Sequence, residues 1–193
     1  MVYWGTSFSG GNVIYAAAVD RRIRAAIVQR PAVTESLACQ DRIPSFFADR
    51  ARIVAGAGPA QVLCTAPNLE VARAETTPAL FPELHSNKSF VGIHDCGGRW
   101  ESGMTQQTQL HMLEFEPQSM TRRIAPTPLL MVVPGNDHTV LRPSQLISFG
   151  KAREPRQLVY LEAAGHFDVY TGDFFERNIA AQIKFLKSGV LDN

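Results

Sequence analysis

The chain has 193 residues, and at about 150 residues per domain this length predicts one domain with an insertion. Apolar residues make up 45% of it, and 19 lysines and arginines nearly balance 18 aspartates and glutamates, so the protein is globular and lacks the basic excess of a nucleic-acid-binding protein. No apolar run reaches the roughly 18 residues of a membrane span, and the N-terminus lacks the basic start and apolar run of a signal peptide.

The first 30 residues alternate short apolar runs with turn signals. Residues 2–4 are β-branched and aromatic and predict a strand, and a glycine- and serine-rich turn follows at 5–11. Residues 12–19 are rich in alanine and predict a buried helix, and residues 23–28 predict a second strand. A strand, a helix and a strand within about 30 residues form a βαβ unit, which implies a parallel sheet.

The middle of the chain, residues 35–125, is less regular. A helix is predicted over 43–57, whereas 58–100 is rich in proline, glycine and polar residues. Long irregular segments of this kind are usually functional or poorly ordered. We interpret 35–125 as a cap or lid inserted into a single domain rather than as a second domain.

The last third returns to alternating strands and helices. The continuous apolar run at 129–133 is typical of a strand buried on both faces. A helix over 142–153, a strand over 157–161 and a final helix over 172–187 follow. The final helix has its apolar residues on one face, at Phe175, Ile179, Ile183 and Leu186. We therefore group 126–193 with 1–34 as parts of one domain.

The cysteines point to no metal site and no disulfide framework. Cys39, Cys64 and Cys96 are odd in number, widely spaced and without a CxxC pair. We expect a reduced, cytoplasmic setting.

The glycine- and serine-rich turn has the form of a nucleophile elbow. Ser7 directly follows the first predicted strand, precedes the first predicted helix, and has the small residues Gly5 and Ser9 two positions away on either side. Ser9 also has small flanks, but it would lie one step into the helix, so we favour Ser7 as the nucleophile. The backbone N–H of Phe8, at the start of that helix, would be an oxyanion donor. A phosphate-binding loop is disfavoured, because no Walker lysine and no GxGxxG spacing is present.

A hydrolase of this kind needs an acid and then a histidine, each in a loop after a later strand. Asp137 follows the strand at 129–133, and His166 follows the strand at 157–161. In these positions His166 would act as the general base for Ser7, and Asp137 would hold the histidine tautomer and stabilise the imidazolium.

Other residues are weaker candidates for these two roles. Asp95 is a rival acid, since some hydrolases take the acid from an earlier strand, but no clear strand precedes it. His138 is adjacent to Asp137 and could not easily accept that carboxylate and reach the serine as well. The remaining histidines lie in the irregular middle, at His85, His94 and His111.

Three stretches resemble the α/β-hydrolases, in particular a dienelactone-hydrolase-like branch: residues 3–11, residues 128–137, and residues 165–177 with the string Gly-His-Phe-Asp-Val-Tyr-Thr-Gly. The fungal members of this branch include enzymes of polyketide gene clusters, some of them polyketide transferases. The resemblance implies an α/β fold with a mostly parallel sheet, flanking helices and an inserted cap, and it covers 1–31 and 121–188 well.

The resemblance also carries a departure. In the family, four strands precede the strand of the nucleophile, and the loop after the third supplies a second oxyanion donor. Here the predicted nucleophile strand begins at Val2, which would leave an apolar sheet edge exposed. The expectation is a partial fold that lacks the N-terminal strands. The partner of this partial fold would be a missing N-terminal half or another copy of the chain.

Together these features predict a serine-dependent hydrolase of an ester, thioester or lactone, acting on a small-molecule acyl substrate without metal or organic cofactor. An acyltransferase with the same three residues is the first alternative. A catalytically inactive hydrolase remnant is the second.

Overall fold

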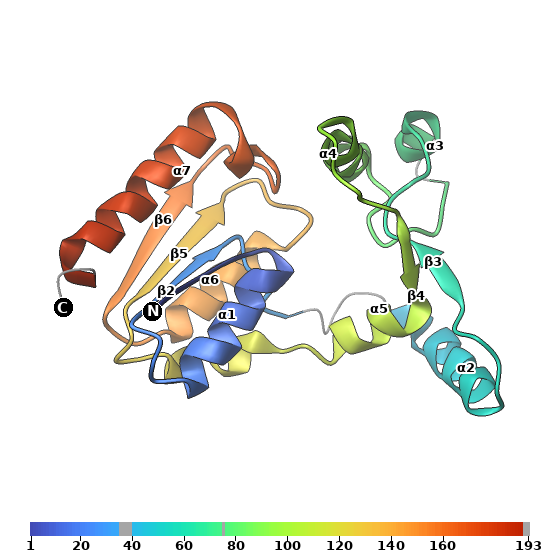
Figure 1. Ribbon diagram of the computed structural model, residues 1–193, viewed down its shortest axis with the longest axis horizontal. Helices are drawn as coiled ribbons and strands as arrows, with labels where there is room; N and C mark the ends of the chain where they lie inside the picture. The colour runs from blue at the N-terminus through green and yellow to red at the C-terminus, as the bar shows by residue number, and fades with distance from the viewer. Residues whose placement is uncertain (35–39, 75, 191–193) are drawn as a thin grey trace. The chain divides into compact units, whose positions relative to one another are not determined.

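The computed structural model describes the chain except for residues 35–39, 75 and 191–193, and except for the side chains of residues 40, 94, 95, 189 and 190 (Figure 1). Cys39 and the side chains of His94 and Asp95 therefore lie outside the described residues. The chain forms two compact units. The first joins Met1–Glu35 to Phe115–Asn193, and the second is Ser36–Glu114.

The first unit is built on a four-stranded, all-parallel sheet, which confirms the predicted fold class. The strands lie in the order β1-β2-β5-β6. Their bounds are Val2–Thr6, Ala25–Gln29, Leu129–Pro134 and Arg156–Leu161. Every residue of β2 and β5 is buried, as the continuous apolar run of β5 predicts for a central strand with helices on both faces.

Helices cover both faces of this sheet (Figure 1). The three main ones are α1 (Phe8–Val19), α6 (Arg142–Lys151) and α7 (Gly172–Phe185). One core cluster joins α1 and α6 to the sheet and includes Val13, Ile14, Val28, Met131, Val133, Leu146 and Phe149. The cluster on the opposite face includes Ala25, Ile27, Leu130 and Phe185 of α7. The sheet is thus the middle layer of three.

The helix α1 begins at Phe8, four residues earlier than the sequence predicts. Glycine destabilises a helix, so the glycines at 10 and 11 favour a later start in the sequence. In the structure these two glycines are required by close packing. A Cβ on Gly10 would lie 2.9 Å from the Cβ of Pro31, and a Cβ on Gly11 would lie 2.4 Å from the carbonyl oxygen of Ala32. The helix packs this closely on the segment after β2, and only glycine leaves the room.

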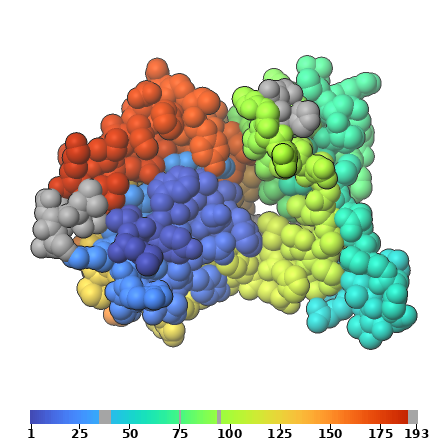
Figure 2. Space-filling model, viewed as in Figure 1, coloured from blue at the N-terminus to red at the C-terminus, as the bar shows by residue number. Residues whose placement is uncertain are grey.

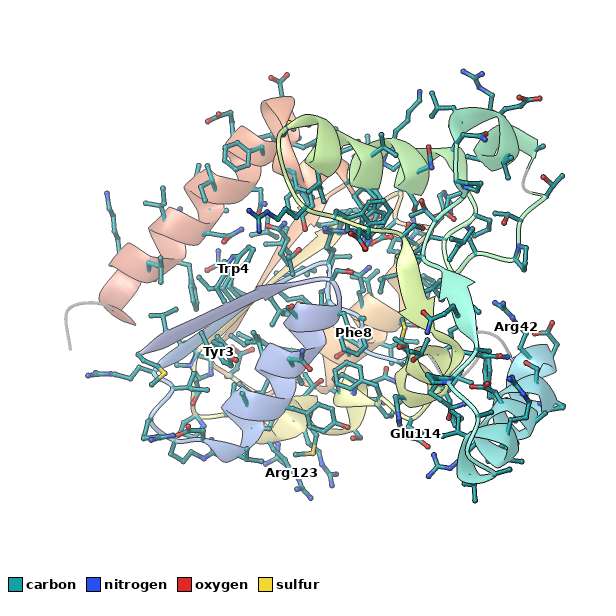
Figure 3. All side chains as sticks on the ribbon, turned by 45° about the vertical axis from the view of Figure 1, so that its right-hand side comes forward. Tyr3, Trp4, Phe8, Arg42, Glu114 and Arg123 are labelled. Atoms are coloured by element: carbon teal, nitrogen blue, oxygen red, sulfur yellow. The ribbon has the colours of Figure 1, made fainter. Side chains whose placement is uncertain are left out.

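The strand β1 forms one edge of the sheet. Tyr3 and Trp4 project to opposite faces of the strand and remain 41% and 48% exposed (Figure 3). Trp4 lies on the side of α7, where its indole N–H donates a hydrogen bond of 2.8 Å to Gln182. In the space-filling view the residues of β1 and α1 form part of the near surface (Figure 2). Among the described strands, β1 pairs with β2 alone.

Residues 115–125 belong to the first unit, whereas the sequence reading placed them in the inserted segment. Two short 3₁₀ turns, Pro117–Ser119 and Thr121–Arg123, pack on α1. Ile124 is buried in the same core cluster as α1, and the hydroxyls of Thr121 and Ser148 lie 2.8 Å apart. These contacts are long-range, so the sequence does not reveal the boundary.

The second unit is more regular than the sequence predicts. A 3₁₀ turn and six further elements occur: Gln40–Arg42, α2 (Ile43–Val54), β3 (Gln61–Leu63), α3 (Leu69–Ala74), α4 (Leu84–Asp95), β4 (Gly103–Thr105) and α5 (Gln106–Leu113). The expectation of an irregular segment over 58–100 is wrong, because three-residue strands and polar helices leave no clear periodicity. In the part of the chain that the structure describes, no helix has the length and apolar character needed to cross a bilayer.

Candidate active site

Ser7 occupies the sharp turn between β1 and α1. Its backbone has φ 52° and ψ −124°, a conformation that a residue with a side chain seldom adopts. Two backbone hydrogen bonds hold the turn: the Ser7 N–H donates to the Gln29 carbonyl at 3.0 Å, and the Ala32 N–H donates to the Ser7 carbonyl at 2.9 Å. The end of β2 and the segment after it therefore hold Ser7 in its strained backbone conformation, as in a nucleophile elbow.

Gly5 has no room for a side chain, because a Cβ there would lie 2.4 Å from the carbonyl oxygen of Ser9. We expect Gly5→Ala to lower the free energy of unfolding by about 1–3 kcal/mol or more, as overpacking does. Urea denaturation of the complete gene product measures this change. Gly150→Ala is the matched control. Gly150 lies in α6, and a Cβ added there would meet no neighbouring atom within 4 Å outside its own helix. We expect the free energy of unfolding of this variant to change little or to rise slightly. Equal midpoints for the two variants would contradict the close packing of the elbow.

Ser7, His166 and Asp137 form a continuous hydrogen-bonded chain. Ser7 Oγ lies 3.2 Å from His166 Nε2, and His166 Nδ1 lies 2.9 and 3.0 Å from the two carboxylate oxygens of Asp137. His166 and Asp137 are 4% and 3% exposed, whereas Ser7 is half-buried. The structure thus brings together all three residues that the sequence predicts for the site, with the serine oxygen at its more accessible end.

The carboxylate of Asp137 is held by the turn that follows β5. Oδ1 accepts hydrogen bonds from the backbone N–H groups of Thr139 and Val140 at 3.0 and 2.9 Å. Oδ2 accepts one of 3.0 Å from the side-chain amide of Gln145, a fully buried residue of α6. Donors on both oxygens fix the rotation of the carboxylate.

The loops after β5 and β6 approach each other so closely that Gly135 is obligatory. A Cβ there would lie 2.0 Å from the carbonyl oxygen of Glu162. The Gly135 N–H donates to Leu161 O at 2.8 Å, and the Asn136 N–H donates to Ala164 O at 2.9 Å. These bonds between loops, rather than the positions along the chain, bring the acid to the histidine.

The histidine loop contacts a residue that the sequence analysis did not single out, Arg30. It follows β2 directly, is 2% exposed and has φ 40°. Its guanidinium lies over the rings of Phe167 and Tyr170, 5.2 and 4.4 Å from their centroids, and Nη2 donates a hydrogen bond to the Tyr170 hydroxyl. Burial lowers the pKa of this guanidinium, and the nearby Tyr170 and Asp137 oppose that effect. The signal in the sequence is an arginine at the end of an otherwise buried strand.

Phe8 is the first residue of α1, so its N–H is among the helix donors that have no acceptor within the helix. This is the position that an oxyanion donor beside Ser7 occupies. The side chain of Phe8 is stacked on Phe115 with ring centroids 4.4 Å apart, and it anchors the start of the helix (Figure 3).

The alternative residues have other surroundings. Ser9 is exposed in the first turn of α1. His138 Nε2 lies 2.9 Å from the side-chain oxygen of Asn136. The others belong to the second unit, namely His85, His94, Asp95 and His111. Within the described part of the chain, no group of three or more histidine, cysteine or acidic side chains is arranged to hold a metal ion.

Comparisons with known proteins give relatives but no family model that matches. The chain is 27% identical to the thiohydrolase aneE of Aspergillus aculeatus, over 95% of this chain and 60% of that protein. It is 30% identical to the polyketide transferase grgF of a Penicillium species, with the same coverage of 95% and 60%. It is 29% identical to the quorum-quenching protein AidA of Acinetobacter baumannii, over 97% and 61%. The chain thus spans about 60% of the length of these curated relatives.

Solved structures support the same fold. The crystal structure of the α/β hydrolase GrgF from Penicillium sp. sh18 matches with a TM-score of 0.76 and 28% identity, over 95% of this chain and 62% of that one. The structure of DcsB in complex with its substrate analogue matches with a TM-score of 0.78 over 96% and 63%, and its 21% identity supports the fold alone. The chain therefore has an α/β fold that closely matches an α/β hydrolase, and its homologues and structural neighbours are α/β-hydrolase-like proteins.

Proposed function

We propose that this chain carries the catalytic residues of a serine hydrolase that cleaves an ester, thioester or lactone through an acyl-enzyme. The observation that carries the proposal is the hydrogen-bonded chain from Ser7 Oγ through His166 to Asp137, with Ser7 in a strained turn. Its three roles are nucleophile, general base and orienting acid. The hydrolase-type relatives support the same reaction class.

In the acylation step His166 Nε2 takes the proton of the Ser7 hydroxyl while Oγ bonds to the carbonyl carbon of the substrate. Asp137, hydrogen-bonded to Nδ1–H, keeps the Nε2 lone pair directed at Ser7 and stabilises the imidazolium. The carbonyl oxygen becomes negatively charged in the tetrahedral intermediate. The Phe8 N–H, at the positive end of α1, stabilises that charge.

Collapse of the intermediate breaks the bond to the leaving group, which takes the proton from His166 and departs as an alcohol or a thiol. A water molecule then gives its proton to His166 and attacks the acyl-enzyme. His166 returns the proton to Ser7 Oγ, and the product leaves as a carboxylic acid. Every proton in the cycle passes through the single nitrogen His166 Nε2.

Transfer of the acyl group to an alcohol or amine is the second candidate function, because several relatives bear the name polyketide transferase. The thiohydrolase relatives favour water as the acceptor and a thioester as the substrate. The two reactions separate when an acyl thioester is supplied with and without added alcohol or amine. Free acid as the sole product supports hydrolysis, and an ester or amide product supports transfer.

A fluorophosphonate probe tests the nucleophile in the complete gene product. We expect the probe to label Ser7, because a paired imidazole activates the hydroxyl. Labelling should disappear in Ser7→Ala and persist in Ser9→Ala, the matched control in the first turn of α1. Mass spectrometry that places the adduct on Ser9 would overturn the assignment. Absence of any adduct on folded protein would favour the inactive remnant.

A further inference from the structure

The guanidinium of Arg30 is buried next to the site without a full set of acceptors. Nη2 donates to Tyr170, but Nε and Nη1 have no hydrogen-bond partner although both are enclosed. Among the described residues no carboxylate forms an ion pair with Arg30. Burying a cation costs free energy unless the cation is paired and hydrogen-bonded. The rings of Phe167 and Tyr170, over which the Arg30 guanidinium lies, offset only part of this cost.

The position of this cation is held by contacts that lead back to the nucleophile. The Tyr170 hydroxyl lies 3.1 Å from Thr6 Oγ1, and Thr6 precedes Ser7. The Arg30 N–H donates to Val132 O at 2.7 Å, which continues the pairing of β2 with β5 beyond the end of the strand. Arg30 also has a left-handed backbone, which a bulky residue rarely adopts and which is common at functional sites. The guanidinium is therefore two hydrogen bonds away from the residue next to Ser7.

We propose that Arg30 is the cationic centre of a substrate subsite beside Ser7, where its guanidinium binds a carboxylate carried by the substrate. The location rests on the proposed function of Ser7, whereas the anion binding does not. A planar guanidinium matches a carboxylate with two parallel hydrogen bonds, and Nη1 and Nη2 form one such pair of donors.

Access to the guanidinium depends on Tyr170. Its side chain is 42% exposed, and its hydroxyl is the neutral acceptor on Nη2. An outward rotation of this exposed ring would free Nη2 from the hydroxyl and open the guanidinium on the side that Tyr170 covers. The carboxylate then replaces the neutral hydroxyl by a charged acceptor, and hydrogen bonds to charged acceptors are roughly twice as strong.

Matched pairs of substrates test the subsite in the complete gene product. One pair places the charge on the acyl chain, mono-p-nitrophenyl glutarate against p-nitrophenyl valerate. The other places it on the leaving group, 4-acetoxybenzoate against phenyl acetate. We expect wild type to prefer the charged member of at least one pair in kcat/KM. Arg30→Gln should reduce that preference, the ratio of kcat/KM for the charged ester to kcat/KM for the neutral one, by roughly 30-fold or more, as for loss of one partner of a buried charge pair.

Two further variants make the result specific. Arg30→Lys keeps the positive charge but loses the two parallel guanidinium donors, so it should retain part of the preference for the charged substrate. Arg177→Gln removes an arginine that also lies over an aromatic ring, Phe174 at 5.9 Å, and it should leave the preference unchanged. If Arg30→Gln leaves both charge preferences as in wild type, Arg30 binds no substrate carboxylate and the subsite does not exist.

A binding measurement separates failure of the subsite from failure of the proposed function. Monomethyl glutarate and methyl valerate are titrated into Ser7→Ala, with and without Arg30→Gln, and the heat of binding is measured. Tighter binding of monomethyl glutarate that depends on Arg30 supports the subsite even if no ester is turned over. Ester turnover with neither a charge preference nor this difference in binding overturns the subsite and leaves the hydrolase proposal standing.

Discussion

Replacing Ser7 by alanine is expected to lower kcat for ester hydrolysis by about 10⁶-fold, the size of effect that removal of a triad serine has in a serine protease. The reason is structural: Ser7 Oγ lies 3.2 Å from His166 Nε2, the nitrogen positioned to take its proton. Without that oxygen no acyl-enzyme forms. Steady-state turnover of p-nitrophenyl acetate measures the loss, and the initial burst of p-nitrophenol should vanish with it.

Ser9→Ala is the matched control for this prediction. Ser9 lies two residues further along, is exposed, and belongs to α1, so its loss should leave both kcat and the burst close to wild type. A Ser7→Ala enzyme that keeps its burst would contradict covalent catalysis at Ser7.

Replacing Asp137 by asparagine is expected to lower kcat by up to about 10⁴-fold, as substitutions that favour the wrong histidine tautomer do. The asparagine amide can donate to His166 Nδ1, which would leave the proton on Nε2, where it blocks abstraction from Ser7. The backbone N–H groups of Thr139 and Val140 can still donate to the asparagine oxygen and hold the side chain in place, so most of the loss should lie in kcat rather than in folding. Turnover and a thermal melt, measured together, separate the two effects.

Asp95→Asn serves as the comparison, because Asp95 is the rival acid that the sequence leaves open. We expect its turnover to remain near wild type. The reverse outcome, a large loss in Asp95→Asn and a small one in Asp137→Asn, would move the acid to the second unit and refute the role assigned here to the loop after β5.

The parallel sheet could be predicted because its evidence is local. A strand covered on both faces must be apolar throughout, and β5 shows this in one uninterrupted run. The elbow is also visible locally, since Gly5 stands where a Cβ would meet the backbone of Ser9. The order of Ser7, Asp137 and His166 could be predicted in the same way, because each residue lies in the turn or loop after a strand of the parallel sheet.

The second unit could not be predicted in the same way. Its strands β3 and β4 are three residues long and pair across about 40 residues of sequence, and such short segments carry no periodicity. The end of the second unit lies at Glu114, whereas the sequence analysis ended the inserted segment at 125. The difference arises because residues 115–125 pack on α1, and a long-range contact of this kind leaves no pattern in the local sequence.

The sequence by itself determined the parallel fold, and it predicted the turn at Ser7 and the candidate acid and histidine, Asp137 and His166. Only the tertiary structure decided that His166 reaches both Ser7 and Asp137, and that Arg30 is buried against Phe167 and Tyr170. The physical reason is the range of the interactions. Hydrophobic periodicity and steric limits on a turn act over a few neighbouring residues, whereas Arg30 and Tyr170 are 140 residues apart and meet only once the sheet has formed.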